Sequence, residues 1–196
     1  MNKTDGSIGK LVSFFFEVGT LRKTLRSHRQ TLLTDDLSDN IASHSFRVSM
    51  IGWFLAVAEK ADPHQVVMMC LLHDLEETRA GDQNWVHKKY VKVFEEEIRK
   101  SQLKPLPGAK ELLKLSSEYQ ERKTLEAKVA KDADLLDQIL ILKEYAWQGN
   151  QEAECWLKGK EQEKLMFTPI AKKLAQEAYR QKPSQWWNNL WTNSRR

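Results

Sequence analysis

Residues that interrupt helices are scarce in this chain, which has eight glycines and five prolines among 196 residues. Cysteine is scarcer still, because Cys70 and Cys155 are the two present and they form no C-x-x-C pair. The sequence therefore gives no sign of a disulfide framework or a zinc ribbon. We expect both cysteines to be reduced and the protein to be cytoplasmic.

Long apolar runs and a strong charge of one sign are also lacking. Phe14, Phe15 and Phe16 form a short apolar patch, but there is no signal-peptide pattern and no run of about 18 apolar residues. The net charge is only +4, from 31 basic and 27 acidic residues, and no basic stripe with interleaved aromatic residues is visible. We expect no export signal, no membrane partner and no nucleic-acid partner.

The composition that remains is typical of a globular protein, with 41% apolar and 30% charged residues. Apolar residues recur at helical spacing, whereas alternation with a period of two is absent. Helices are predicted at residues 8–19, 40–60, 63–81, 86–101, 109–148, 160–181 and 184–192, with residues 22–39 mostly loop. We predict an all-α fold in a single domain, 1–196, with C-terminal helices at about 160–192 packing on a core at about 8–150.

Ionisable residues interrupt two of the apolar helix faces. His44 lies on the apolar stripe of its predicted helix and therefore points inward. The helix that begins at Pro63 is apolar for two turns and then carries His73, Asp74 and Glu77. At 3.6 residues per turn, these three side chains project toward one side.

Imidazole and carboxylate groups in this arrangement suit a divalent metal cation. Such ligands accept Mn, Fe, Co, Ni, Zn or Mg, and a bound metal would offset the cost of burying Asp74 among leucines. The alternative is a polar pair at a helix end, with His73 a hydrogen-bonded core histidine and Asp74 exposed. His44 alone could equally be a core histidine.

Two aspartates of the predicted helix at 109–148 compete for a further ligand position. Asp132 and Asp134 are about 200° apart around a helix, and each lies on a partly apolar face. The spacing alone does not choose between them.

Three segments together resemble one known family. They are residues 40–48 (NIASHSFRV), 72–82 (LHDLEETRAGD) and 129–134 (VAKDAD). Their order of His, then His-Asp, then Asp resembles the signature of the HD-domain superfamily of metal-dependent phosphohydrolases. More closely, the segments resemble the branch of that superfamily that contains 5'-deoxyribonucleotidases.

The resemblance implies an all-helical HD-domain bundle and a set of site residues. The implied metal ligands are His44, His73, Asp74 and Asp134, so the family pattern favours Asp134 over Asp132. The implied catalytic residues are Glu77, which would position or deprotonate the attacking water, and Asp82, a substrate-proximal acid.

Two basic residues are candidates for binding the substrate phosphate. Arg26 resembles the arginine that members of this family place before the first histidine, and a guanidinium suits a phosphate dianion. The aromatic residue that commonly follows that arginine is absent here. Lys88 could also face a phosphate. The alternative for both is an ordinary solvated side chain.

The C-terminal segment carries an apolar group made of Trp186, Trp187, Leu190 and Trp191. Packing back onto the core of the chain is the favoured interpretation, and an interface in a homodimer is the alternative. The family resemblance also makes a homodimer an expected assembly.

We expect from these patterns an enzyme that hydrolyses (deoxy)nucleoside 5'-monophosphates to a nucleoside and phosphate with a divalent cation. One alternative is hydrolysis of another phosphate ester, such as a nucleoside triphosphate, a signalling nucleotide or a cyclic phosphodiester. The other is a nucleotide-binding module without turnover.

Overall fold

The computed structural model describes residues 3–190 of the chain. The α-helices are α1 (Lys3–Val18), α2 (Arg29–Leu32), α3 (Ile41–Glu59), α4 (Pro63–Leu72), α5 (Glu77–Ala80), α6 (Trp85–Tyr90), α7 (Glu95–Leu103), α8 (Ala109–Glu121), α9 (Leu125–Trp147), α10 (Gln151–Gly159), α11 (Glu161–Leu165) and α12 (Pro169–Arg180). Two 3₁₀ helices, η1 (Gly19–Lys23) and η2 (Pro183–Leu190), complete the described part. No strand occurs within it, so the predicted all-α fold is confirmed.

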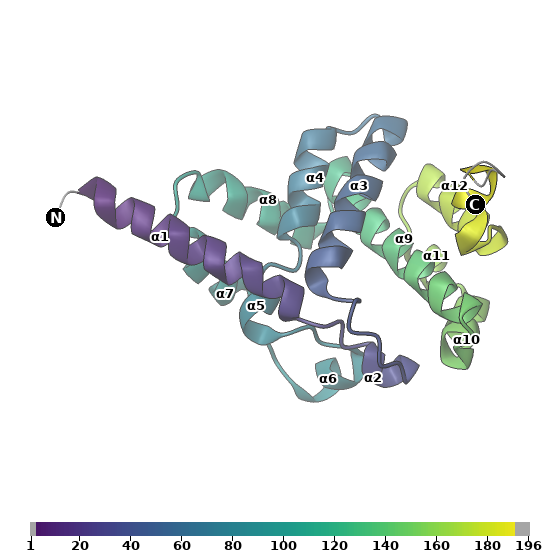
Figure 1. The fold of residues 1–196 in the computed structure, drawn as a ribbon. Coiled ribbons are helices and arrows are strands. Elements are labelled where there is room, and N and C mark those ends of the chain that lie inside the picture. Colours follow the sequence, from purple (N-terminus) through teal and green to yellow (C-terminus); the bar gives the residue numbers. More distant parts are fainter. Residues whose placement is uncertain (1–2, 191–196) are drawn as a thin grey trace.

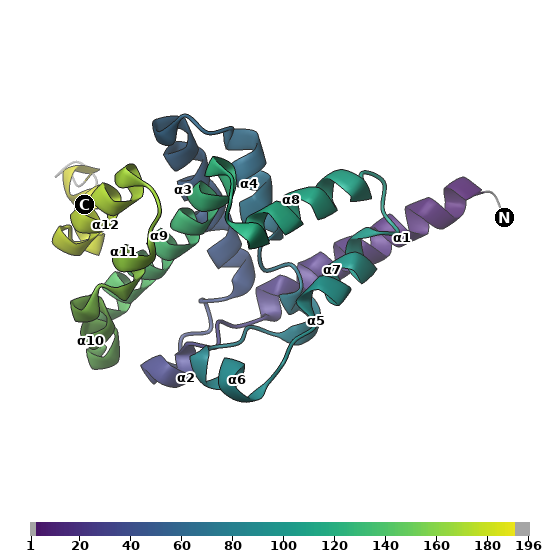
Figure 2. The same cartoon turned by 180° about the vertical axis from the view of Figure 1, so that it is seen from behind.

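The longest helix, α9, is the centre of the arrangement. It packs against α3 and α4, against α8, and against α10, α11 and α12. Figure 1 shows α3 and α4 side by side over α9, with the C-terminal helices beyond it, and Figure 2 shows the same arrangement from behind. In both views α1 extends away from this group toward the N-terminus.

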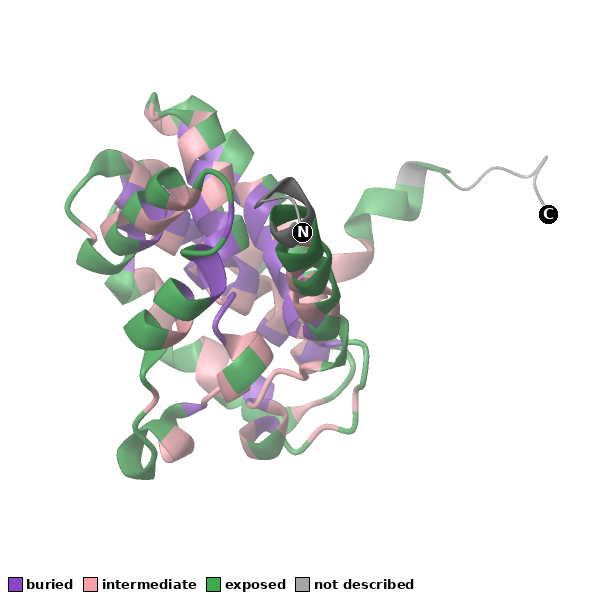
Figure 3. Cartoon of the chain, turned by 90° about the vertical axis from the view of Figure 1, so that its left-hand side faces the viewer, coloured by how far each residue is buried: buried purple, intermediate pink, exposed green. Residues whose placement is uncertain are grey.

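The hydrophobic core lies between α3, α4 and α9 and continues to α12. Leu55, Val66, Ile139 and Ala175 are fully buried members of it, and Figure 3 shows the buried segments on the inside of the bundle. Helices α3 and α4 approach closely at Gly52. A Cβ atom there would lie 2.9 Å from the Sγ atom of Cys70, so this position needs the smallest residue.

The predicted helix at 63–81 is wrong in one respect, because α4 ends at Leu72. The His73 Nδ1 atom lies 2.7 Å from the carbonyl oxygen of Cys70 and donates to it. From this point the backbone bonds connect residues three apart, as in the 3.3 Å bond from Leu75 N to Leu72 O. The tighter turn separates α4 from the short α5.

Three further predicted helices are each divided in two. Val91 has an extended backbone and separates α6 from α7. Arg122 adopts a left-handed conformation and ends α8, after which Thr124 caps α9. Met166 ends α11 in an extended conformation, and Pro169 opens α12. The sequence analysis also missed α10, which Asn150 caps by accepting from the backbone N–H of Ala153.

The prediction that the C-terminal tryptophans pack onto the core is wrong for the described residues. Trp186 and Trp187 pair edge to face with ring centroids 4.9 Å apart. Both are exposed, as is Leu190. Trp191 lies outside the described residues.

By length and hydropathy alone, α3 would qualify as a membrane span. The core helix of a globular protein meets the same criteria. Here α3 packs against α4 and α9, with Val48 and Leu55 fully buried.

Candidate active site

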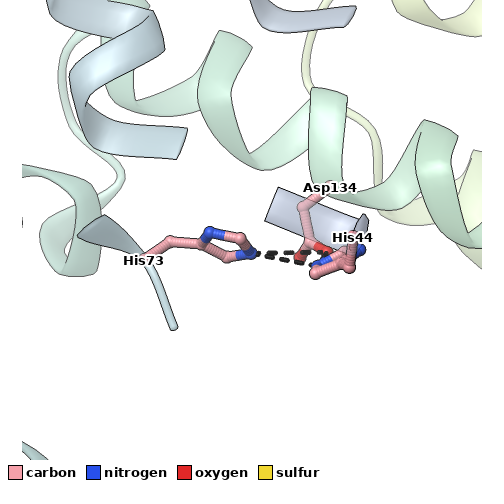
Figure 4. A group of neighbouring side chains, drawn as sticks. All are labelled: His44, His73 and Asp134. Atoms are coloured by element: carbon pink, nitrogen blue, oxygen red, sulfur yellow. Dashed lines mark hydrogen bonds and ion pairs between the residues drawn. The ribbon is translucent and has the colours of Figure 1, made fainter. Parts of the chain in front are cut away.

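Three elements bring two histidines and an aspartate together. His44 lies in the first turn of α3, which Asn40 caps in a reciprocal pair of hydrogen bonds with Ser43. His73 follows the last residue of α4, and Asp134 lies in the middle of α9. One ligand atom from each lies within 4.8 Å of the others. Figure 4 shows His73 reaching toward His44 and Asp134 from the opposite side.

Four of the distances in this cluster match those between ligands of a single cation, and the fifth, from His73 Nε2 to Asp134 Oδ1, is longer at 3.9 Å. The Nε2 atoms of His44 and His73 lie 3.2 Å apart, and the Asp134 Oδ1 atom lies 3.4 Å from His44 Nε2. Asp74 Oδ2 lies 3.4 Å from His44 Nε2 and 3.1 Å from His73 Nε2. Ligands about 2.1 Å from one metal ion are about 3.0–3.5 Å apart.

The hydrogen bonds made by the two imidazoles also fit a cation. His73 Nδ1 must donate to the Cys70 carbonyl, and His44 Nδ1 lies 2.6 Å from Asp137 Oδ2 and donates to that carboxylate. In neutral imidazoles both Nε2 atoms then carry lone pairs, and these lone pairs face each other. A divalent cation between them and the two carboxylates would satisfy all four groups, so the donor set can hold a metal.

The structure separates the two competing aspartates. Asp132 points toward the segment before α12 and accepts hydrogen bonds from the Phe167 N–H and from the N–H and hydroxyl of Thr168, at 2.7–2.8 Å. Asp134 lies in the histidine cluster instead, where Lys131 pairs with its Oδ2 atom at 2.7 Å. Burial opposes its charge, but Lys131 and the two imidazoles hold the pKa of Asp134 well below its usual range.

A further carboxylate, which the sequence analysis missed, supports the cluster. Asp137 is 2% exposed and is bonded both to His44 and to the Nε atom of Arg47. Arg47 in turn donates to Glu144 at 2.8 Å. This chain of contacts fixes the tautomer and the orientation of the His44 ring. Its position one helical turn after Asp134 was the signal in the sequence.

A cavity of about 360 Å³ opens onto the cluster, and its wall includes His73, Asp74 and Asp134. Arg26 lines it as well, with a side chain 12% exposed. Within the described part of the chain, its Nε and Nη1 atoms have no hydrogen-bond partner. Burial opposes its charge, but nearby carboxylates, Asp74 first among them, raise the pKa of Arg26. A buried guanidinium with free donors is suited to an anionic ligand.

The other predicted site residues, Glu77, Asp82 and Lys88, line the same cavity. Asp82 Oδ2 accepts the Ser27 N–H at 2.7 Å and lies 3.6 Å from Arg26 Nε. Burial raises the pKa of Glu77 to about 10, and the charges of Asp74 and Asp82 add to the effect. A cation bound by Asp74 would remove part of that repulsion.

Several further residues of the wall were not predicted. The Tyr119 ring lies edge to face with His73, at a centroid distance of 5.6 Å, and Arg122 stacks on that tyrosine at 3.5 Å. Trp85 and Lys88 also line the cavity, and both are exposed. No sequence motif marks these positions. The turns that bring them to the cavity were not predicted, so their closeness to His73 could not be inferred from the sequence.

Comparisons with known proteins agree with this arrangement. Residues 18–176 match the family model of the HD domain. The 5'-deoxynucleotidase HDDC2 of Dictyostelium discoideum is 29% identical over 150 residues, which cover 70% of this chain and 78% of that protein.

Solved structures with similar folds include two from prokaryotes. The PH0347 protein of Pyrococcus horikoshii OT3 is 26% identical with a TM-score of 0.72, over 86% of this chain and 98% of that one. A predicted metal-dependent phosphohydrolase from Magnetospirillum magnetotacticum MS-1 is 28% identical with a TM-score of 0.60, over 89% of this chain and 96% of that one.

Proposed function

Because the chain belongs to the HD domain family, a family of metal-dependent phosphohydrolases, we propose that it hydrolyses (deoxy)nucleoside 5'-monophosphates to nucleoside and phosphate. One observation carries the proposal. The cluster of His44, His73, Asp74 and Asp134 opens into the same cavity as the buried, unpartnered donors of Arg26. Support for the substrate class comes from the similarity to a 5'-deoxynucleotidase.

The proposed metal ligands are His44, His73, Asp74 and Asp134. When bound, a divalent cation would neutralise phosphate charge and lower the pKa of a water molecule. The two nitrogen and two oxygen donors suit Mn, Fe, Co, Ni or Zn better than Mg, which prefers oxygen.

The chain's own residues would perform the remaining steps. Arg26 binds the phosphate through its free donors. Asp82, which follows α5, pairs with the guanidinium and holds it in position. Glu77 orients the attacking water and takes its proton. The water oxygen forms a bond to phosphorus while the bond to the 5'-oxygen breaks, and the proton that Glu77 accepted passes to that oxygen as the nucleoside leaves. Lys88 lines the same cavity and is proposed as a second phosphate contact.

The experiment is phosphate release from deoxy- and ribonucleoside 5'-monophosphates with Co, Mn, Mg or no metal. Asp134→Asn is compared with Asp132→Asn, because the two aspartates share α9 and only the first lies in the cluster. Metal-dependent release that is lost in Asp134→Asn and kept in Asp132→Asn is the expected result. Full release by Asp134→Asn would overturn the metal assignment.

Release confined to nucleoside triphosphates, signalling nucleotides or cyclic diesters would instead support the alternative phosphohydrolase. Tight nucleotide binding without product in any metal would support a binding module. The homodimer, the cytoplasmic location and the absence of nucleic-acid and membrane partners stay predictions from the sequence.

A further inference from the structure

The cavity wall is mostly polar and charged, and Trp85 is an exception to this character. Its side chain lines the cavity, yet 66% of the residue is open to solvent. Trp156 also lines the cavity, but it is partly buried and packs against the cluster formed by Leu32, Leu142, Tyr145 and Ala153. Trp85 therefore offers an indole surface that the described part of the fold leaves uncovered.

The position of Trp85 is fixed relative to Arg26 by contacts between two distant segments. Asn84 caps α6 by accepting from the backbone N–H groups of Val86 and His87. Its amide nitrogen donates to the Ser27 carbonyl at 2.9 Å, while the Ser27 N–H donates to Asp82 at 2.7 Å. Trp85 is the next residue after Asn84, so its backbone is held beside the segment that carries Arg26.

Further contacts stabilise the packing of the start of α6 against the segment that carries Arg26. The Asn84 amide also donates to Gln30 Oε1 at 3.1 Å, and Asn84 is buried. Lys88 follows Trp85 by one helical turn, and both side chains line the cavity. One face of α6 thus presents an indole ring and an ammonium group to the cavity.

We propose that Trp85 stacks on the aromatic base of the substrate, so that the site selects nucleotides over phosphate esters without a base. The inference rests on the proposed function. With the phosphate held by Arg26 next to the His/Asp cluster, the sugar and base would extend along the wall toward Trp85. Stacking on an indole face tolerates every base, so we infer a broad base range.

The test compares wild type, Trp85→Ala and Trp85→Phe on a deoxynucleoside 5'-monophosphate and on 2-deoxyribose 5-phosphate, which has no base. Loss of one base-stacking contact corresponds to roughly 5-fold to 150-fold. We expect Trp85→Ala to lose this much kcat/KM on the nucleotide, mainly through KM, and to lose little on the sugar phosphate. Trp85→Phe should recover most of the loss.

The matched control is Trp147→Ala, since Trp147 is 54% exposed and is not among the residues that line the cavity. It should behave as wild type on both substrates. A second measurement is calorimetric binding of the nucleotide in EDTA, where Trp85→Ala should bind more weakly than Trp147→Ala.

The outcomes separate the two proposals. If wild type releases phosphate from neither substrate, the proposed function fails. Suppose that wild type hydrolyses nucleotides. If kcat/KM of Trp85→Ala then falls equally on both substrates, or falls on neither, the role of Trp85 is overturned and the proposed function stands.

Discussion

The Nδ1 atom of His44 lies 2.6 Å from the Oδ2 atom of Asp137, and both groups are almost completely buried. Asp137 follows Asp134 by one turn of α9. A single helix therefore supplies one member of the His/Asp cluster and also the carboxylate that orients another member. This relationship makes α9 central to the site as well as to the core.

Asp137→Asn should weaken metal binding while the fold is retained. An amide cannot accept the His44 N–H with the strength of a carboxylate, and loss of such an outer contact costs about 10-fold to 100-fold in metal affinity. Calorimetric titration with Mn or Co measures the change, and circular dichroism checks the helix content. An affinity equal to that of wild type would contradict the role of Asp137.

Asp132→Asn is expected to show the opposite pattern. Its carboxylate accepts three hydrogen bonds from Phe167 and Thr168, and an amide would place N–H groups against some of those donors. The free energy of unfolding should fall by about 2 kcal/mol, measured in urea. Metal affinity should be unchanged. If Asp132→Asn loses metal affinity without losing stability, Asp132 and not Asp134 would be the metal ligand.

The sequence was informative about residue chemistry and less so about chain geometry. His44, His73, Asp74 and Asp134 were predicted as ligands from the family pattern, and the structure brings them together. Spacing could not choose between Asp132 and Asp134. The choice depends on the segment before α12, a distant part of the chain that covers Asp132.

The missed helix ends have a related cause. Arg122 ends α8 in a left-handed conformation that usually favours glycine, and the absence of a glycine there left this helix end unmarked in the sequence. Arg122 instead stacks on Tyr119 at 3.5 Å, a contact seen only in the folded chain. The spacing of Asp137, one turn after Asp134, was not used in the sequence analysis because its partner His44 lies beside it only in the folded chain.

Arg26 is expected to contribute to binding of the substrate phosphate. Replacing it with methionine should lower kcat/KM for a nucleotide about 10-fold to 100-fold, because charge-assisted hydrogen bonds to phosphate are lost. The same change removes the positive charge that faces Asp74 and Asp82, so without metal the melting temperature should also fall. Arg22→Met, at an exposed arginine of η1, is the control and should leave kcat/KM unchanged. A kcat/KM of Arg26→Met equal to that of wild type would contradict the proposed role.

The stability of the protein should depend on pH through Asp39. Burial opposes its charge, but the hydrogen bond from His28 at 2.6 Å and one from the Tyr145 hydroxyl at 3.1 Å lower the pKa of Asp39. A carboxyl whose folded pKa lies below its unfolded value of about 3.9 stabilises the folded state above that pH. The contribution is lost as the pH falls through the folded pKa.

Asp39→Asn should therefore reduce the free energy of unfolding by about 2 kcal/mol near pH 6, and the gap from wild type should narrow as the pH falls toward 3. Urea unfolding at several pH values measures this gap. Asp35→Asn is the matched control, because Asp35 is exposed in the same loop, and its gap should stay near zero throughout. If the difference in unfolding free energy between wild type and Asp39→Asn does not change with pH, the charge of Asp39 does not contribute to stability. A narrowing gap means that the charge of Asp39, held by His28 and Tyr145, anchors the loop before α3.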